Sequence, residues 1–287
     1  MSVPPFLDLP RHVSAARLGT PRGEFAVLHG TTSQPPRGTA LLVPGFTGSK
    51  EDFIALLEPL LDHGYSVVAI DGVGQNDTPG RSAAGGYSLA AFGADTVAVR
   101  AALSTSGPVH LVGHSLGGLI GRQAVLLDPT FASLTLLCSG PSAIPEEQRV
   151  RLRLYATVLA EHGSEVVWQA MQALEREQGN RPPEDARVRA FLAERFRRND
   201  PKSLLAMVDI LLNEPSRNAE LAATGIPLLV LTGADDDLWW PTIQADMADA
   251  LGAAHVVIED AGHSPAVDRP EETANHLVAF WSTVGGP

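Results

Sequence analysis

Short apolar runs alternate with longer amphipathic stretches along most of this chain of 287 residues. The runs are rich in Val, Leu and Ile at consecutive positions, which is typical of strands that are covered on both faces in a parallel sheet. We expect strands at residues 25–29, 39–44, 66–71, 109–113, 133–138, 227–232 and 255–259, and helices at 52–63, 89–104, 119–127, 242–251 and 271–283. The alternation predicts an α/β fold with a doubly wound, mostly parallel sheet, whose sites lie at the carboxyl ends of the strands.

Residues 141–218 interrupt this alternation. The segment predicts four successive helices, at 146–162, 165–178, 184–198 and 202–213, and prolines punctuate it. It carries 12 basic and 12 acidic residues, so the rest of the chain accounts for the whole net charge of −12. We therefore expect a core domain at 1–140 and 219–287, and an inserted helical cap, or lid, at 141–218.

The overall composition narrows the class of protein. A hydrophobic content of 44%, a charged content of 19% and a pI near 5.1 indicate a globular chain and argue against nucleic acid or an anionic membrane surface as a partner. No apolar stretch is long enough for a membrane helix, and residues 1–20 lack the pattern of a signal peptide. The single cysteine, Cys138, fits a reducing compartment and a buried structural thiol. These features predict a cytoplasmic protein that binds a small molecule, and they leave its oligomeric state open.

A Gly-x-Ser-x-Gly turn around Ser115 carries the main chemical signal. It joins an expected strand at 109–113 to an expected helix at 119–127. A serine at such a sharp turn is held in a strained conformation with its hydroxyl exposed, and Gly113 and Gly117 avoid collisions with neighbouring backbone. The turn also sets the amide of Leu116 at a helix N-terminus, where it can stabilise an oxyanion. Ser115 is therefore the candidate nucleophile.

A nucleophilic serine needs a base, and the base needs an orienting acid. His263 is the candidate base, because it follows the last expected strand in a loop just before the last helix. His114, although next to the serine, is interpreted as structural. Three consecutive carboxylates follow the preceding strand, and among them we select Asp236, three residues after Gly233, with Asp237 as the alternative.

These residues, in the order Ser115, Asp236, His263, resemble the catalytic residues of the α/β-hydrolase family, and the resemblance extends from about residue 20 to 283. In that family the loop after an early strand supplies a second oxyanion amide. The matching segment here is 44–48, so the resemblance assigns that role to the amide of Phe46. Two positions depart from the family pattern: Pro44 stands where a histidine is usual, and Val73 where an arginine is common.

The resemblance implies a serine hydrolase that acts on an ester or related carbonyl substrate through an acyl-enzyme, with no cofactor and no metal. The apolar surroundings of the expected site favour a neutral to hydrophobic substrate, with Trp168, Trp239 and Trp240 as candidate pocket residues. Two alternatives stay open. One is a C–C bond hydrolase or cofactor-free lyase of the same fold, and the other is a receptor-like member that binds a ligand without turnover.

Overall fold

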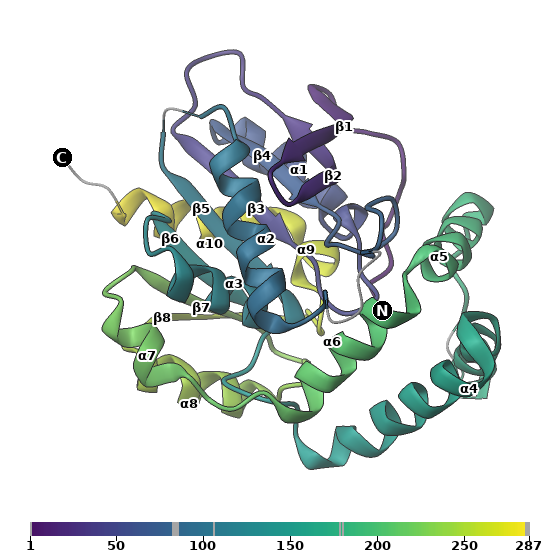
Figure 1. Ribbon diagram of the computed structural model, residues 1–287. Helices are drawn as coiled ribbons and strands as arrows, with labels where there is room; N and C mark the ends of the chain where they lie inside the picture. Colours follow the sequence, from purple (N-terminus) through teal and green to yellow (C-terminus); the bar gives the residue numbers. More distant parts are fainter. Residues whose placement is uncertain (1, 82–85, 106, 178, 180, 285–287) are drawn as a thin grey trace.

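An eight-stranded sheet runs through the molecule, with helices on both of its faces (Figure 1). The computed structural model describes residues 2–81, 86–105, 107–177, 179 and 181–284. The strand order is β1-β2-β4-β3-β5-β6-β7-β8. Strands β3 to β8 are parallel, whereas β2 pairs antiparallel with β1 and β4. The strands are β1 (Val13–Thr20), β2 (Gly23–Gly30), β3 (Gly38–Val43), β4 (Tyr65–Ile70), β5 (Val109–His114), β6 (Ser133–Leu137), β7 (Leu228–Gly233) and β8 (Ala254–Ile258). The predicted α/β fold with a mostly parallel sheet is confirmed.

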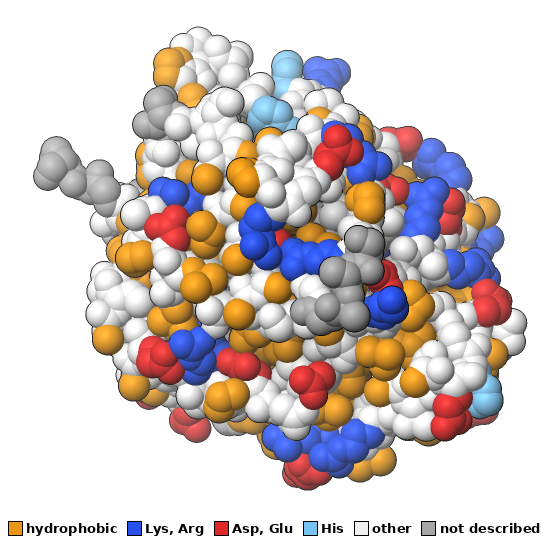
Figure 2. All heavy atoms as spheres, in the orientation of Figure 1, with side chains coloured by type: hydrophobic (Ala, Val, Ile, Leu, Met, Phe, Trp, Pro, Cys, Tyr) orange, Lys and Arg blue, Asp and Glu red, His pale blue; other side chains and the backbone are white. Residues whose placement is uncertain are grey.

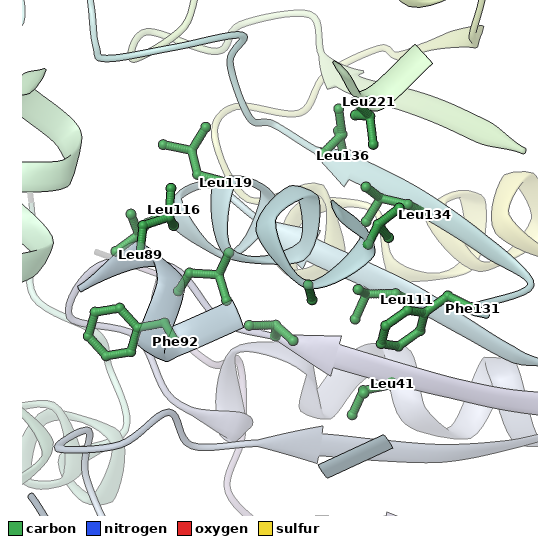
Figure 3. Packing of buried hydrophobic residues seen from close by; sticks show 14 of the residues in the cluster. Leu41, Leu89, Phe92, Leu111, Leu116, Leu119, Phe131, Leu134, Leu136 and Leu221 are labelled. Atoms are coloured by element: carbon green, nitrogen blue, oxygen red, sulfur yellow. The ribbon is translucent and has the colours of Figure 1, made fainter. Parts of the chain in front are cut away.

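Each central strand contributes side chains to two separate cores, because successive residues point to opposite faces. Leu41 of β3 packs on one face of the sheet, and the next residue, Leu42, packs on the other. The first face is covered by α2 (Leu89–Ala102), α3 (Leu116–Leu127), α7 (Asn218–Ala223) and α8 (Pro241–Leu251). Figure 3 shows the leucines of α3 against those of β5 and β6. The second face is covered by η1 (Lys50–Phe53), α1 (Ile54–Asp62), α9 (Pro265–Asp268) and α10 (Pro270–Thr283).

The edge strand β1 is absent from the prediction. Its side chains are mostly exposed, so its sequence lacks the apolar run that marks the other strands. It forms by hairpin pairing with β2 across the turn at Pro21 and Arg22, with Thr20 opposite Gly23. Tertiary pairing rather than hydrophobic pattern therefore defines this strand.

Four helices lie between β6 and β7: α4 (Glu146–Glu177), α5 (Ala186–Arg198), α6 (Pro201–Asn213) and α7. Gly163 breaks α4 with a φ of 78° and a ψ of 176°, so its two parts match the helices expected at 146–162 and 165–178, of which residue 178 lies outside the described residues. The segment has a core of its own around Trp168, Leu192 and Phe196. However, Met207 and Leu211 of α6 pack into the main core, and α7, which was not predicted, lies against α8.

Charges of both signs are interspersed on the face shown in Figure 2, where Lys and Arg lie among Asp and Glu. Within the described residues, no helix is both long and apolar enough to cross a membrane.

Candidate functional site

Ser115 lies at the tip of a tight turn between β5 and α3. Its φ of 57° and ψ of −123° belong to a region that a non-glycine residue adopts only under strain, at a cost of order 1–3 kcal/mol. A Cβ on Gly113 would overlap the backbone of Gly117, and a Cβ on Gly117 would overlap the carbonyl oxygen of Val43. The two glycines are therefore required by close backbone approach, as the sequence predicted. The turn directs the Ser115 side chain into a cavity at the carboxyl end of the sheet.

Asp236 and His263 meet at the same end of the sheet, in the loops that follow β7 and β8. His263 Nδ1 lies 2.8 Å from Asp236 Oδ1. The same oxygen accepts the backbone N–H of Leu238 at 3.0 Å, and Asp236 Oδ2 accepts Gln244 Nε2 at 2.8 Å. Asp236 is only 3% exposed, whereas Asp237 is exposed and its carbonyl accepts a hydrogen bond from Gln148. The structure thus brings Asp236, and not the alternative Asp237, into contact with His263.

The environment of Asp236 keeps its carboxyl group ionised. Burial by itself raises the pKa of this group. The hydrogen bond and charge of His263, and the hydrogen bonds from Leu238 and Gln244, lower the pKa and together outweigh burial. The pKa of Asp236 therefore lies below its ordinary value. An ionised carboxylate at this position fixes the tautomer in which Nδ1 of His263 carries the proton. That tautomer leaves His263 Nε2 free to accept a proton.

His114 is a buried neutral imidazole that holds the loop of His263. Burial, followed by the neighbouring charge of His263, lowers the pKa of His114 to about 3. Its Nε2 therefore donates to the carbonyl oxygen of His263 at 2.6 Å. The interpretation of His114 as structural agrees with this contact, but the loop that it holds was not foreseen, because the two residues are 149 positions apart.

The loop at 44–48 lies directly against the serine. An added Cβ on Gly45 would be 2.9 Å from Ser115 Cβ and 3.3 Å from its Oγ. Thr47 has a φ of 59°, and its hydroxyl donates to the carbonyl of Phe46 at 2.6 Å. Among the described residues, no acceptor is paired with the N–H of Phe46. The N–H of Leu116 belongs to the first turn of α3, where backbone donors have no partner within the helix.

Ser115 and His263 line a cavity of about 390 Å³ between the sheet and the inserted helices. Its apolar side chains come from the core and from α4 and α6: Phe46, Ile144, Leu152, Tyr155, Met171, Leu211 and Leu238. Its polar side chains include Ser2 and Gln148, and Asp52 is the buried carboxylate among them. Ser2 was not predicted here, because nothing in its local sequence shows that it would contact both Ser264 of the core and Arg195 of the insertion.

None of the three tryptophans expected as candidate pocket residues is among the described residues that line this cavity. Trp168 packs on Phe196 in the core of the insertion, and Trp240 is 40% exposed to solvent. Trp239 is buried and tilted against the ring of His263, with ring centroids 6.5 Å apart. Trp239 therefore supports the histidine from behind rather than facing a ligand.

Cys138, Asp236 and His263 present ligand atoms within 4.8 Å of one another, a spacing that a metal ion could bridge. Burial, followed by the charge of Asp236, raises the pKa of the Cys138 thiol well above its ordinary value, so the thiol stays protonated. A protonated thiol is a poor metal ligand. Cys138 instead accepts the N–H of Gly233 at 3.3 Å, as a structural thiol.

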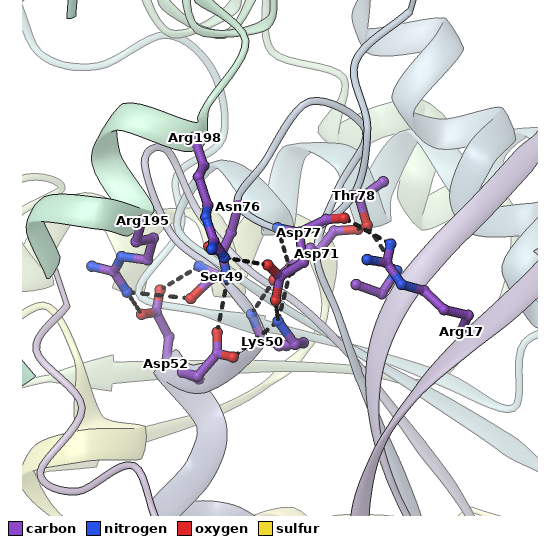
Figure 4. A network of polar contacts seen from close by, with 12 residues as sticks. Arg17, Ser49, Lys50, Asp52, Asp71, Asn76, Asp77, Thr78, Arg195 and Arg198 are labelled. Carbon is purple, nitrogen blue, oxygen red and sulfur yellow. Dashed lines mark hydrogen bonds and ion pairs between the residues drawn. The ribbon is translucent and has the colours of Figure 1, made fainter. Parts of the chain in front are cut away.

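A network of ion pairs joins the inserted helix α5 to the core beside this cavity (Figure 4). Arg195, with 0% exposure, donates to Asp52 at 2.5 Å, and Arg198 donates to Asp77 at 2.6 Å. Lys50 lies between Asp71 and Asp77, at 2.9 and 2.8 Å. Burial would lower the pKa of Lys50, but the surrounding carboxylates raise it, so the ammonium stays charged.

Comparisons with known proteins identify the family of this chain. Residues 40–276 match the model of the alpha/beta hydrolase family. The chain is 29% identical over 285 residues to the "Putative carbamate hydrolase RutD" of Variovorax paradoxus, covering 91% of this chain and 98% of that protein. It is 27% identical over 237 residues to the pimeloyl-[acyl-carrier protein] methyl ester esterase of Methylococcus capsulatus, covering 77% and 86%.

A solved structure has the same fold. A thermophilic esterase from Thermogutta terrifontis superposes with a TM-score of 0.74 at 22% identity, over 95% of this chain and 100% of that one. The match of the family model covers most of the chain. The chain therefore belongs to the alpha/beta hydrolase family and is a hydrolase of that fold.

Proposed function

We propose that this protein is a cofactor-independent serine hydrolase that cleaves an ester or related carbonyl substrate through a Ser115–His263–Asp236 triad. One observation carries the proposal. The strained Ser115 and His263 line a common cavity, and the far side of His263 is held at 2.8 Å by a buried carboxylate. This combination of nucleophile, base and orienting acid is the arrangement required for acyl transfer.

The acylation step uses each group once. Ser115 Oγ attacks the substrate carbonyl carbon while its proton passes to Nε2 of His263, and the carbonyl π pair moves onto oxygen. The N–H groups of Phe46 and Leu116 stabilise that oxyanion, an effect worth about 3 kcal/mol per donor. When the tetrahedral adduct collapses, the bond to the leaving oxygen breaks, and that oxygen takes the proton from His263. Asp236 remains ionised and stabilises the imidazolium.

Deacylation repeats the sequence with water as the nucleophile. His263 accepts a proton from the water as its oxygen attacks the acyl carbon, and the same two amides bind the new oxyanion. Collapse then breaks the bond to Ser115 Oγ, which takes the proton back. The products are a carboxylic acid and the free serine.

We expect a small neutral substrate with an apolar acyl group, because apolar side chains from the core and from α4 and α6 line the cavity beside Ser115. Asp52 is a charged residue of the lining whose charge is paired with Arg195, and the lining also contains Arg151, Glu175 and Asp237. Relatives named as a carbamate hydrolase and as a methyl ester esterase are consistent with an acyl group bound to oxygen or nitrogen. Residues 141–218 act in this proposal as the cap that determines access and substrate preference.

A fluorophosphonate probe with peptide mass mapping tests the nucleophile, and a series of 4-nitrophenyl esters tests the reaction. We expect labelling at Ser115, and Ser115→Ala should lose both the label and turnover by a factor of about 10³ or more. A folded Ser115→Ala variant that keeps a tenth of the rate would contradict the proposal. Turnover of β-diketones but not of esters would indicate a C–C hydrolase, and ligand binding without any turnover would indicate a receptor.

A further inference from the structure

The carbonyl oxygen of Gly45 accepts two hydrogen bonds at the edge of the candidate site. One comes from the side chain of Gln75, with Nε2 at 2.8 Å, and the other from the backbone N–H of Gly48 at 3.1 Å. Gln75 is buried and belongs to the loop after β4, 30 positions from Gly45. A buried side-chain donor directed at one carbonyl fixes the orientation of that peptide group.

Gln75 is itself held so that only its amino group can face Gly45. Its Oε1 accepts the N–H of Gly72 at 3.0 Å, which leaves Nε2 as the donor on the other side. A Cβ on Gly72 would come within 2.5 Å of that oxygen, so the glycine makes room for this contact. The loop is anchored in turn by Asp71, whose N–H donates to Ala26 and whose carboxylate accepts from Lys50.

The orientation of the Gly45 carbonyl determines that of the Phe46 N–H. The two groups belong to one planar trans peptide, so they point in opposite directions. The carbonyl faces Gln75, and a Cβ added to Gly45 would lie 2.9 Å from Ser115 Cβ, so this peptide is next to the serine. The N–H of Phe46 has no acceptor among the described residues. A free N–H beside the nucleophile is what an oxyanion requires.

We propose that Gln75 is the positioning residue of the oxyanion hole: it holds the Gly45–Phe46 peptide so that the Phe46 N–H faces the oxygen of the tetrahedral adduct. The proposal rests on the proposed function, because it assigns Gln75 a role in the same site. Gln75 does not line the cavity and acts only through the peptide. Its removal therefore weakens binding of the transition state and leaves binding of the substrate ground state intact.

Two variants of different chemistry test this role. Gln75→Met keeps the length of the side chain without a donor, and Gln75→Glu keeps the acceptor for Gly72 but places a carboxylate against the carbonyl of Gly45. In both we expect kcat for a 4-nitrophenyl ester to fall by about 10- to 100-fold, with KM within about threefold. The inhibition constant of an alkyl boronic acid, whose tetrahedral adduct on serine places an oxygen in the oxyanion hole, should rise by the same factor as kcat falls.

Gln123→Leu is the matched control. Gln123 is a buried glutamine of α3 that accepts from Arg217 outside the cavity, so kcat and boronate binding should stay at wild-type values. The midpoint of the activity–pH curve should not move in the Gln75 variants, because Asp236 and His263 are untouched. Either Gln75 variant, folded and with kcat and boronate binding unchanged, overturns the role of Gln75 alone. A wild-type protein that is not labelled at Ser115 overturns the proposed function as well.

Discussion

Among the three consecutive aspartates at 235–237, the course of the backbone determines which side chain reaches His263. The sequence at 235–237 offers three carboxylates after β7, and spacing alone could not exclude Asp237. In the structure Asp236 turns inward, where His263, Gln244 and the N–H of Leu238 surround it. Its two neighbours are exposed, and Asp237 also lines the cavity. A buried carboxylate needs hydrogen-bond donors for both oxygens, and Asp236 has them, whereas an exposed carboxylate is solvated by water.

Substitution of Asp236 by Asn should lower kcat by a factor of about 10⁴, because an amide at this position favours the wrong tautomer of His263. Asp235→Asn is the matched control and should alter kcat by less than about threefold, since that side chain is exposed and does not line the cavity. Asp237 lines the cavity, but Asp237→Asn should still cost far less than Asp236→Asn, because Asp236 is the carboxylate in contact with His263. Steady-state hydrolysis of a 4-nitrophenyl ester measures all three variants. A larger loss at Asp237 than at Asp236 would reverse the assignment.

The local geometry of the candidate site was predictable where the backbone imposes it. Close backbone approach requires Gly113 and Gly117, and Ser115 stands between them in a strained conformation, so five consecutive positions carry the signal. Gln75 and Ser2 act through contacts with residues 30 and 262 positions away, and no local pattern marks them. The sequence could not show whether the three tryptophans line this cavity, because the lining of a cavity depends on how helices pack after they form.

Among the elements, α5 is joined to the core by two arginine–aspartate pairs of very different burial. Arg195 and Asp52 are both buried, and burial raises the pKa of Asp52 although Arg195 opposes the shift. Arg198 and Asp77 are partly exposed. Removing one partner of a buried pair leaves an uncompensated charge, whereas an exposed pair contributes little.

Arg195→Met should therefore lower the free energy of unfolding by about 3–5 kcal/mol, and Arg198→Met by about 1 kcal/mol or less. The double variant Arg195→Met/Asp52→Asn should recover part of the loss, because it removes both charges together. Urea unfolding at pH 7.5 measures all three, with limited proteolysis to show whether α5 detaches. Equal losses for Arg195→Met and Arg198→Met would mean that burial does not control this contact.

Helices and strands were predictable where a local pattern marks them, and were missed where contacts with distant residues define them. The central strands were predicted within one or two residues, because burial on both faces demands consecutive apolar side chains. The edge strand β1 and the short helices α7 and α9 were missed, because pairing or packing with neighbours defines them. The composition of 141–218 marked the insertion, but it could not show that α6 packs into the main core through Met207 and Leu211.

At the scale of the whole molecule, two buried histidines link stability to pH. Burial lowers the pKa of His110 to about 4 and contributes most to the pKa of about 3 for His114. An unfolded chain has histidines near pKa 6.5, so below that pH it binds more protons than the folded chain does. The stability that each neutral histidine provides is therefore complete above pH 6.5 and is lost as the pH falls toward 4.

His110 allows this effect to be measured away from the candidate site. It lies at the opposite end of β5 from Ser115, stacked on Trp281 with ring centroids 4.9 Å apart, and its Nδ1 is 2.8 Å from Ser133 Oγ. At pH 5.0 the buried, neutral state of His110 should cost the folded protein about 2 kcal/mol. This pH lies about 1.5 units below the unfolded pKa of 6.5, and each unit corresponds to about 1.4 kcal/mol. We expect His110→Gln to lower the free energy of unfolding at pH 7.5. At pH 5.0 the loss caused by the same substitution should be smaller by about 2 kcal/mol.

The comparison between the two pH values isolates His110, because buried carboxyl groups such as Asp71, whose pKa burial raises to about 7, titrate equally in wild type and variant. Urea unfolding monitored by circular dichroism at both pH values gives the four free energies that are needed. His162→Gln on α4 is the control, since that side chain is 58% exposed. An effect of His110→Gln that is the same at pH 7.5 and pH 5.0 would show that this ring is not held neutral by its burial beneath Trp281.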